Sequence, residues 1–407
     1  MDEVLYEFGH AEGGITAPAG FLAAGVSAGL KRSGRRDVAV IATGSPCPAA
    51  AVFTTSATAA PPVLVSREHV SGGMLRAVVV NAGNANACTG EQGMAHARSM
   101  AAHAAGALGC EPTEVVVCST GVIGVPLPLE LVNAGIDAAV DSLDNTAGDA
   151  AAEAIMTTDT FAKQLALTVH ADGRTFTVGG MAKGSGMIQP NMATMLAFLT
   201  TDAPLAPEVC DVVLRHVVSR SFNRITVDSD TSTNDTCVLM ASGAEGGAPL
   251  GPDSPAYPAI VAAVTEVATA LAKMVVRDGE GATKLITVRV SGAASEDDAE
   301  LVAFSIANSP LVKTAMFGQD ANWGRVAMAI GKSGARVDAS VFDITLAGIV
   351  TCRQGAATGF DEDDAARALA EPEIEIAVDL HVGDAEATVW TCDFSYDYVR
   401  INGDYRS

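Results

Sequence analysis

GGMAKGSGMIQPNMATMLAFLTT, residues 179–201, is the stretch around which the rest of the chain is organised. Glycines flank Lys183, and glycine allows positive φ and close approach of the backbone to a neighbour. Pro190 fixes its own φ and pushes Gln189 toward an extended conformation. The apolar run from Ala193 to Phe198 then predicts a buried strand. Thr194 is therefore expected where a constrained loop enters a buried strand.

A threonine in that position has two interpretations. It is either one β-branched strand residue among many, or a nucleophile aimed at its own chain. In the second case its hydroxyl attacks the carbonyl of Ala193, and hydrolysis of the resulting ester gives chains 1–193 and 194–407. The new α-amine of Thr194, with an unperturbed pKa of ~7.7–8, then acts as the base for its own hydroxyl.

The string GGMAKGSGMIQPNMATML resembles the signature of the ornithine acetyltransferase (glutamate N-acetyltransferase) family of arginine biosynthesis, whose members cleave themselves before a threonine. Further strings extend the resemblance along nearly the whole chain: NANACTG at 84–90, STGVIG at 119–124, STND at 232–235 and DGEGATK at 278–284. The resemblance favours the self-cleaving interpretation, with cleavage between Ala193 and Thr194.

The resemblance also implies the site. The nucleophile is Thr194, the oxyanion is stabilised by Thr120 and Gly121, and the substrate-binding residues are Thr157, Lys183, Thr194, Glu280, Asn402 and Ser407. Without the family, STGVIG is an ordinary glycine turn, a glutamate between glycines is a solvated loop charge, and the chain end is frayed. The NANACTG string is equally an Asn-rich turn or a direct substrate contact.

The implied reaction transfers acetyl from N-acetylornithine to Thr194 and then to glutamate, giving ornithine and N-acetylglutamate by ping-pong kinetics. Lys183 suits a substrate carboxylate or lowers the pKa of the Thr194 amine, and Glu280 suits a substrate ammonium. No cofactor is expected, but acetyl-CoA remains an alternative donor, and the chain lacks the phosphate-loop spacing G-x-x-x-x-G-K-S/T. Two alternatives are a self-processing amidase or aminopeptidase with the same nucleophile and a non-enzymatic protein that keeps the fold.

Composition restricts partners and location. A net charge of −23 argues against nucleic acid, and no H-E-x-x-H or clustered Cys/His predicts a metal site. Eight cysteines without a C-x-x-C pair predict reduced thiols in a cytoplasmic protein. The acidic N-terminus lacks the layout of a secretion signal. No run approaches ~18 uninterrupted apolar residues, so no membrane-spanning helix is expected.

We expect an α/β fold, a layered αββα-type sandwich with a smaller C-terminal α/β lobe. The predicted division is 1–276 and 277–407, with the second part contributing Glu280 and the chain end to the site. The family implies a heterotetramer of two plus two cleaved chains. Locally, the pattern predicts helices at 92–108, 208–219 and 256–276, a strand at 62–66, and a hairpin of strands near 374–380 and 387–390.

Overall fold

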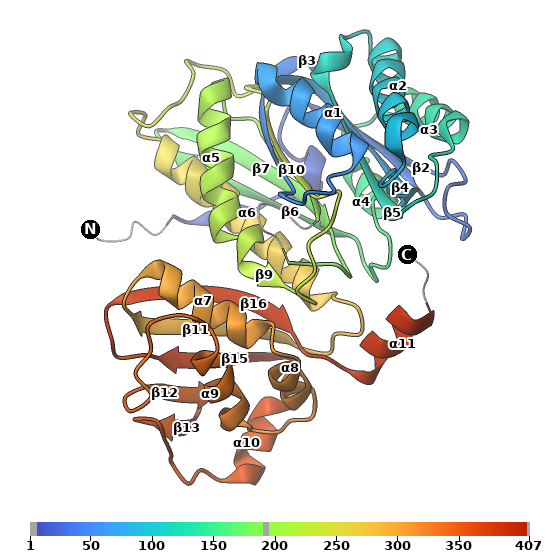
Figure 1. Cartoon of the computed structure of the whole chain (residues 1–407). Helices are drawn as coiled ribbons and strands as arrows, with labels where there is room; N and C mark the ends of the chain where they lie inside the picture. Colours follow the sequence, from blue (N-terminus) through green and yellow to red (C-terminus); the bar gives the residue numbers. More distant parts are fainter. Residues whose placement is uncertain (1–5, 190–194, 405–407) are drawn as a thin grey trace.

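The structure is a computed structural model that describes residues 6–189 and 195–404. Three predicted site residues, Ala193, Thr194 and Ser407, lie outside these ranges. Figure 1 shows a larger part built by the first two-thirds of the chain and a smaller part built mainly by the last third, each with its own sheet.

The larger part contains a nine-stranded sheet in the order β1-β6-β7-β8-β10-β3-β4-β5, with β2 beside β3. The long strand β3 joins its two halves, because its beginning pairs with β2 and β4 while its end pairs with β10. The register shifts between Ala42 and Cys47, where β3 passes from one half to the other. The strands are β1 (Phe8–His10), β2 (Phe21–Val26), β3 (Val38–Phe53), β4 (Met74–Asn84), β5 (Val115–Val122), β6 (Lys163–Ala171), β7 (Arg174–Lys183), β8 (Leu196–Thr201) and β10 (Thr236–Ala241).

The two halves of this sheet face each other across an apolar core. Ile41 and Val78 from one half share that core with Phe198 and Met240 from the other. Helices cover both outer faces: α5 (Pro207–Arg220) and α6 (Tyr257–Arg277) on one, α2 (Gly90–Leu108) and α3 (Leu129–Asp141) on the other. The layers therefore run α, β, β, α, and the predicted fold class is confirmed.

Helix α6 forms because apolar residues recur at helical spacing, with Ile260, Val264, Val267 and Leu271 all fully buried. By length and composition alone it would be able to cross a membrane. However, it packs against β6 and β7, and the core helix of a globular protein satisfies the same criterion.

The smaller part has a seven-stranded sheet in the order β14-β13-β12-β15-β11-β16-β9. These strands are β9 (Ile225–Thr226), β11 (Leu285–Ala293), β12 (Asp343–Leu346), β13 (Ile349–Arg353), β14 (Ala356–Ala357), β15 (Glu373–Asp379) and β16 (Ala385–Cys392). The accompanying helices are α7 (Glu296–Ala307), α8 (Pro310–Phe317), α9 (Trp323–Gly331) and α10 (Glu362–Leu369). Strand β9, which precedes α6 in the chain, pairs with β16, so the division at 276/277 stays a prediction.

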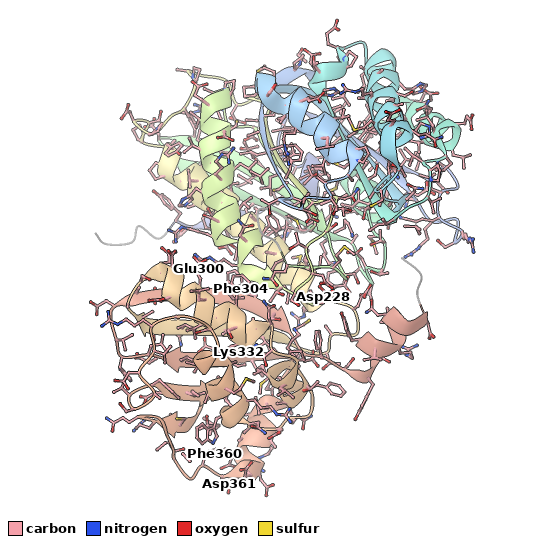
Figure 2. All side chains as sticks on the ribbon, in the orientation of Figure 1. Asp228, Glu300, Phe304, Lys332, Phe360 and Asp361 are labelled. Carbon is pink, nitrogen blue, oxygen red and sulfur yellow. The ribbon has the colours of Figure 1, made fainter. Side chains whose placement is uncertain are left out.

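Ion pairs also join the two parts. Arg224, just before β9, lies 2.9 Å from a carboxylate oxygen of Glu296 and 2.6 Å from one of Glu300 on α7. Figure 2 shows Glu300 at the side of the smaller part that faces the larger one.

Two local predictions were wrong. The predicted strand at 62–66 is part of α1 (Pro61–His69), because Pro61 and Pro62 fit the first helical turn, where no backbone N–H is required. Strands β15 and β16 do not form a hairpin, because β11 lies between them, parallel to β15 and antiparallel to β16.

Candidate active site

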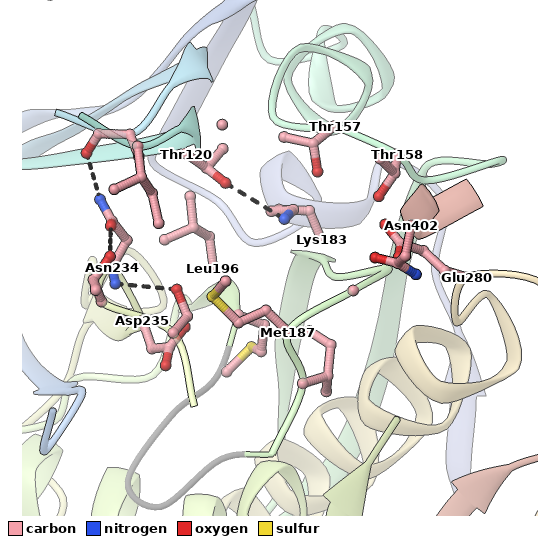
Figure 3. Close-up of a pocket in the computed structure, with 18 residues that line it drawn as sticks. Thr120, Thr157, Thr158, Lys183, Met187, Leu196, Asn234, Asp235, Glu280 and Asn402 are labelled. Atoms are coloured by element: carbon pink, nitrogen blue, oxygen red, sulfur yellow. Dashed lines mark hydrogen bonds between the residues drawn. The ribbon is translucent and has the colours of Figure 1, made fainter. Parts of the chain in front are cut away.

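One pocket brings together all six predicted site residues that the structure describes: Thr120, Gly121, Thr157, Lys183, Glu280 and Asn402. In Figure 3, Lys183 lies between Thr120 and the Glu280–Asn402 pair, and Asn234 and Asp235 line the opposite side. Met195, the residue that follows Thr194 in the sequence, lines the same pocket.

Thr120 and Gly121 lie near the end of β5, where that strand runs beside β4. Gly121 has a φ of 131°, and a Cβ there would lie 2.4 Å from the carbonyl carbon of Gly83. Glycine is therefore required for this close approach. The Nζ atom of Lys183 donates to the Oγ1 atom of Thr120 at 3.4 Å, which leaves the hydroxyl hydrogen of Thr120 available as a donor.

Lys183 ends β7 and is only 7% exposed. Burial lowers the pKa of its ammonium below 10.5, and the carboxylates of Asp159, Asp235 and Glu280 oppose that shift. A buried cation held among carboxylates is suited to binding an anionic ligand group, because burial reduces solvent screening.

Glu280 lies in the turn after α6 and is held from three directions. Its backbone N–H donates to the Ser185 carbonyl at 3.2 Å, and its Oε2 atom accepts from Asn402 Nδ2 at 2.8 Å. A Cβ on Gly186 would lie 2.6 Å from the Glu280 carboxylate, so a larger residue there would displace that carboxylate. Asn402 belongs to α11 (Tyr396–Asp404), and thus the end of the chain folds back onto the site.

The sequence analysis missed a buried ion-pair cluster beneath the pocket. Lys163 Nζ lies 2.7 Å from Asp159 Oδ1 and 2.6 Å from Asp278 Oδ2, and these side chains are at most 4% exposed. Asp159 also accepts the N–H groups of Thr157 and Gly184, each at 2.9 Å. The cluster therefore fixes the backbone beside three predicted site residues, Thr157, Lys183 and Glu280.

Burial opposes ionisation of Asp159, but Lys183 and Lys163 outweigh it, so the pKa of this carboxyl is lowered. In the sequence, the role of Asp159 was indicated only by its closeness to Thr157. Nothing local identifies its partners, because Asp278 lies 115 residues from Lys163.

The loop that carries the STND string holds the backbone on both sides of residues 190–194. Before them, Asp228 accepts the N–H groups of Met187 at 2.7 Å and Ile188 at 2.8 Å. After them, the N–H of Thr236 donates to the Met195 carbonyl at 3.0 Å. The loop therefore packs against the pocket, which the four residues of its STND string line.

Asp235 has an unusual environment. It is 2% exposed, and within the described ranges its Oδ2 atom has no hydrogen-bond partner. Burial raises the pKa of its carboxyl well above 3.8, although hydrogen bonds from Ser232 and the charge of Lys183 oppose the shift. Lys183 thus lies in a pocket that also contains a carboxyl favoured in its protonated form.

The hydrogen bonds in and around the NANACTG string favour the interpretation of an Asn-rich turn over a direct substrate contact. Asn81 Nδ2 donates to the Asn84 carbonyl, Asn84 Nδ2 to the Val125 carbonyl, and Asn86 Nδ2 to the Gly93 carbonyl. Of its residues only Ala85 lines the pocket. The side-chain amides of Asn81, Asn84 and Asn86 thus bond to backbone carbonyls that shape the loop.

The balance of charge predicts what the pocket accepts. In and beneath it, two lysines, Lys163 and Lys183, face three carboxylates, those of Asp159, Asp278 and Glu280, while the fourth carboxyl group, that of Asp235, is favoured in its protonated form. An additional cation, such as a substrate ammonium, is therefore favoured. Within residues 6–189 and 195–404 there is no group of three or more His, Cys, Asp or Glu side chains that would hold a metal ion.

Comparison with known proteins gives a consistent result. The model of the ArgJ family matches residues 22–407. The arginine biosynthesis bifunctional protein ArgJ of Symbiobacterium thermophilum is 53% identical, over 97% of this chain and 99% of its own.

Two solved structures match part of the chain. The crystal structure of ArgJ from Bacillus halodurans is 47% identical with a TM-score of 0.50, and the match covers 51% of this chain and 98% of that one. The structure of ornithine acetyltransferase complexed with ornithine from Mycobacterium tuberculosis is 43% identical with a TM-score of 0.42, over 46% and 100% of the two chains.

Proposed function

The chain belongs to the ArgJ family and is an acyltransferase of arginine biosynthesis, and we propose that its pocket transfers acetyl from N-acetylornithine to glutamate through Thr194. The observation that carries this proposal is the convergence in one pocket of Thr120, Gly121, Lys183 and Glu280 beside Met195, the sequence neighbour of Thr194.

In the first half-reaction the Thr194 oxygen attacks the acetyl carbonyl of N-acetylornithine. The hydroxyl hydrogen of Thr120 and the N–H of Gly121 stabilise the oxyanion. The C–N bond breaks, and the hydroxyl proton of Thr194 passes through its α-amine to the departing ornithine. In the second half-reaction the amine of glutamate attacks the acetyl ester, and the Thr194 oxygen regains a proton.

The two fixed charges of the pocket position both substrates. N-acetylornithine carries a carboxylate and a side-chain ammonium, which suit Lys183 and Glu280 respectively. Glutamate enters the same pocket after ornithine leaves, and its carboxylates again suit Lys183. Charge-assisted hydrogen bonds of this kind contribute ~1.5–3 kcal/mol each, whereas attacking water would use neither of them.

Self-cleavage before Thr194 is part of the proposal. It is supported by the hydrogen bonds that hold Met187, Ile188 and Met195 on either side of residues 190–194. It is supported also by the length of the solved Bacillus halodurans chain, nearly all of which is matched by half of this chain. We further propose a cytoplasmic heterotetramer of two plus two cleaved chains, and acetyl-CoA as a second donor in keeping with the word bifunctional in the relatives' name.

The experiment is to trap the acyl-enzyme. Denaturing electrophoresis of the purified protein should show two fragments. N-terminal sequencing of the second fragment should begin Thr-Met-Leu. When N-acetylornithine is supplied without glutamate, intact-mass measurement should find one added acetyl group on that second fragment. Addition of glutamate should remove it as N-acetylglutamate.

Thr194→Ala is the control, and it should remain one uncleaved chain that takes up no acetyl. If the wild-type protein stays full-length, the nucleophile assignment fails. If acetate accumulates equally fast with and without glutamate, the protein is a hydrolase instead.

A further inference from the structure

A cluster of positive charge stands out in this acidic chain. Residues 31–36 read KRSGRR, which places Lys31, Arg32, Arg35 and Arg36 within six positions of a protein whose net charge is −23. They lie in the β2–β3 loop, residues 27–37. The buried carboxylate of Asp37 holds this loop in shape by accepting the N–H groups of Ala28, Leu30 and Lys31 at 2.6–2.9 Å.

The loop borders the active-site pocket on two sides. The side chain of Lys31 and the carbonyl of Leu30 lie beside Gly83, which packs directly against Gly121. On the other side, Arg35 Nη2 donates at 3.3 Å to the carbonyl of Thr157, a pocket residue. The loop therefore lies just outside the pocket, next to the Thr157 segment and separated from the oxyanion turn by Gly83, and we call this position the rim.

Two of the four cations are available to a ligand. Arg36 pairs with Glu153, and Lys31 Nζ donates to the carbonyls of Arg36 and Ala154. Arg35 is exposed, and among residues 6–189 and 195–404 its side chain bonds only to Ser33 and the Thr157 carbonyl, which leaves most of its N–H donors without a partner there. Arg32 is exposed and, in the part of the chain that the structure describes, forms no ion pair or hydrogen bond.

The distribution of charge favours an anion that binds at the rim rather than inside the pocket. The pocket itself contains Glu280 and only one lysine, Lys183, which Asp159 already faces, so a small acyl group suits it better than a multiply charged phosphate. A donor with a slender acyl arm and phosphates at its far end fits both requirements. Arginine is the side chain best matched to phosphate, because its planar guanidinium donates two parallel hydrogen bonds.

We propose that Arg32 and Arg35 bind the phosphate groups of an acyl thioester donor of the coenzyme A class, while its acetyl end reaches the Thr120–Gly121 turn. This rests on the proposed function, because the acetyl group must reach the same nucleophile. The Thr194 oxygen bonds to the acetyl carbon as the thioester C–S bond breaks. The sulfur leaves as a thiol that carries the hydroxyl proton of Thr194.

The test is the double variant Arg32→Glu/Arg35→Glu, assayed with each acetyl donor separately. Its kcat/KM with acetyl-CoA and glutamate should fall at least about tenfold, the order expected from losing charge-assisted bonds to phosphate. Its kcat/KM with N-acetylornithine and glutamate should stay within about twofold of the wild type, since that donor has no phosphate. Calorimetric titration with adenosine 3′,5′-bisphosphate, the phosphate-bearing end of the donor, should show the same loss of affinity without requiring catalysis.

Lys332→Glu/Arg336→Glu is the matched control, because it changes the net charge equally at two exposed residues of the smaller part; Figure 2 labels Lys332 there. If both double variants lose acetyl-CoA activity and bisphosphate affinity equally, the effect is general charge and the site is refuted. The site is refuted also if the wild type transfers acetyl from N-acetylornithine but neither uses acetyl-CoA nor binds the bisphosphate, an outcome that leaves the proposed transfer from N-acetylornithine to glutamate intact.

Discussion

Lys183 and Asp235 show how single residues set the electrostatics of the pocket. Burial lowers the pKa of the lysine and raises that of the carboxyl, so each shift disfavours the charged form. Each residue also opposes the other's shift by Coulombic attraction. The two side chains thereby hold a polar site inside an apolar core at some cost in stability.

That cost gives the first residue-scale prediction, which concerns Asp235→Asn. An acid whose folded pKa is raised binds its proton more tightly in the native state. Tighter proton binding by the folded state stabilises the protein fully at pH values below the unfolded pKa of ~3.9. This stabilisation is lost as pH rises through the folded pKa, by about 1.4 kcal/mol for each pH unit between the two pKa values. The neutral amide does not titrate. The free energy of unfolding of the variant should therefore increase relative to that of the wild type as pH rises above about 4.

Urea denaturation at a series of pH values measures this difference. Asp253→Asn, at an exposed turn, is the control and should follow the wild-type curve. A gap between the Asp235→Asn and wild-type curves that is constant with pH would contradict the argument, because it would place the effect in packing rather than in ionisation.

The sequence could identify the pocket residues only through motifs. The strings around Thr120, Lys183 and Glu280 are distinctive enough to be matched one by one, and the structure brings these residues together. Asp159 and Lys163 could not be found that way, because their importance depends on contacts with Asp278 and Gly184 that only the fold creates. The raised pKa of Asp235 likewise depends on burial that no local pattern encodes.

At the scale of elements, the loop between β9 and β10 holds the segment before β8 in place by hydrogen bonds. Three hydrogen bonds from it reach Met187 and Ile188, two to the Asp228 carboxylate and one from the Val227 N–H to the Ile188 carbonyl at 2.6 Å. Met187 has a φ of 61°, a left-handed conformation that costs energy for a residue other than glycine. The carboxylate of Asp228 offsets this cost by accepting two N–H groups.

We expect Asp228→Asn to slow self-cleavage. The amide keeps the shape, but its NH2 group cannot accept, so at least one of the two charge-assisted bonds is lost. Such a bond contributes ~1.5–3 kcal/mol, which corresponds to roughly 10–100-fold in the population of the bent loop. Precursor made by cell-free translation and followed by denaturing electrophoresis reports the rate directly.

Asp230→Asn serves as the control, because that exposed side chain lies in the same loop and accepts no backbone N–H from residues 187–188. Equal cleavage rates for Asp228→Asn and the wild type would show that the bent conformation of Met187 and Ile188 does not depend on this carboxylate.

Elements with strong periodicity were predictable and those defined by partners were not. Helix α6 has a continuous buried stripe, which the sequence pattern at 256–276 predicted. The alternation of apolar and polar residues correctly identified β15 and β16 as strands. It does not determine which strands pair, and β11 lies between these two. The short apolar run of α1 is compatible with strand or helix, and its two prolines decided the outcome.

At the scale of the whole molecule, the proposed cleavage would divide the large sheet in an unusual way. Residues 6–189 supply β1, β6 and β7 on one side and β3, β4 and β5 on the other. Between them lie β8 and β10, which belong to the chain that begins at Thr194. The second chain therefore occupies the middle of the first chain's sheet rather than docking at an edge.

Both central strands are tied in on each side and buried on both faces. β8 pairs with β7 over six residue positions and with β10 over six more, while β10 pairs with β3 over five. Every residue of β8 and β10 is buried, and burial of a side chain such as Phe198 or Leu239 contributes ~1.5–3 kcal/mol. Removing either chain would expose strand edges and apolar cores on both sides of the break at once.

This arrangement predicts that the two mature chains are inseparable without unfolding. Wild-type protein should elute from size exclusion with both fragments in one peak in native buffer, at any dilution and at high salt, since backbone pairing and apolar burial hold them together. Fragment 194–407 expressed alone should be insoluble or unfolded, because β8 and β10 would lack β7 and β3. Co-expression of 1–193 with 194–407 should restore a folded complex, as measured by circular dichroism and a cooperative urea transition. Separation of the fragments by salt or dilution alone would contradict the interleaved sheet, whereas separation only across the unfolding transition is the expected result.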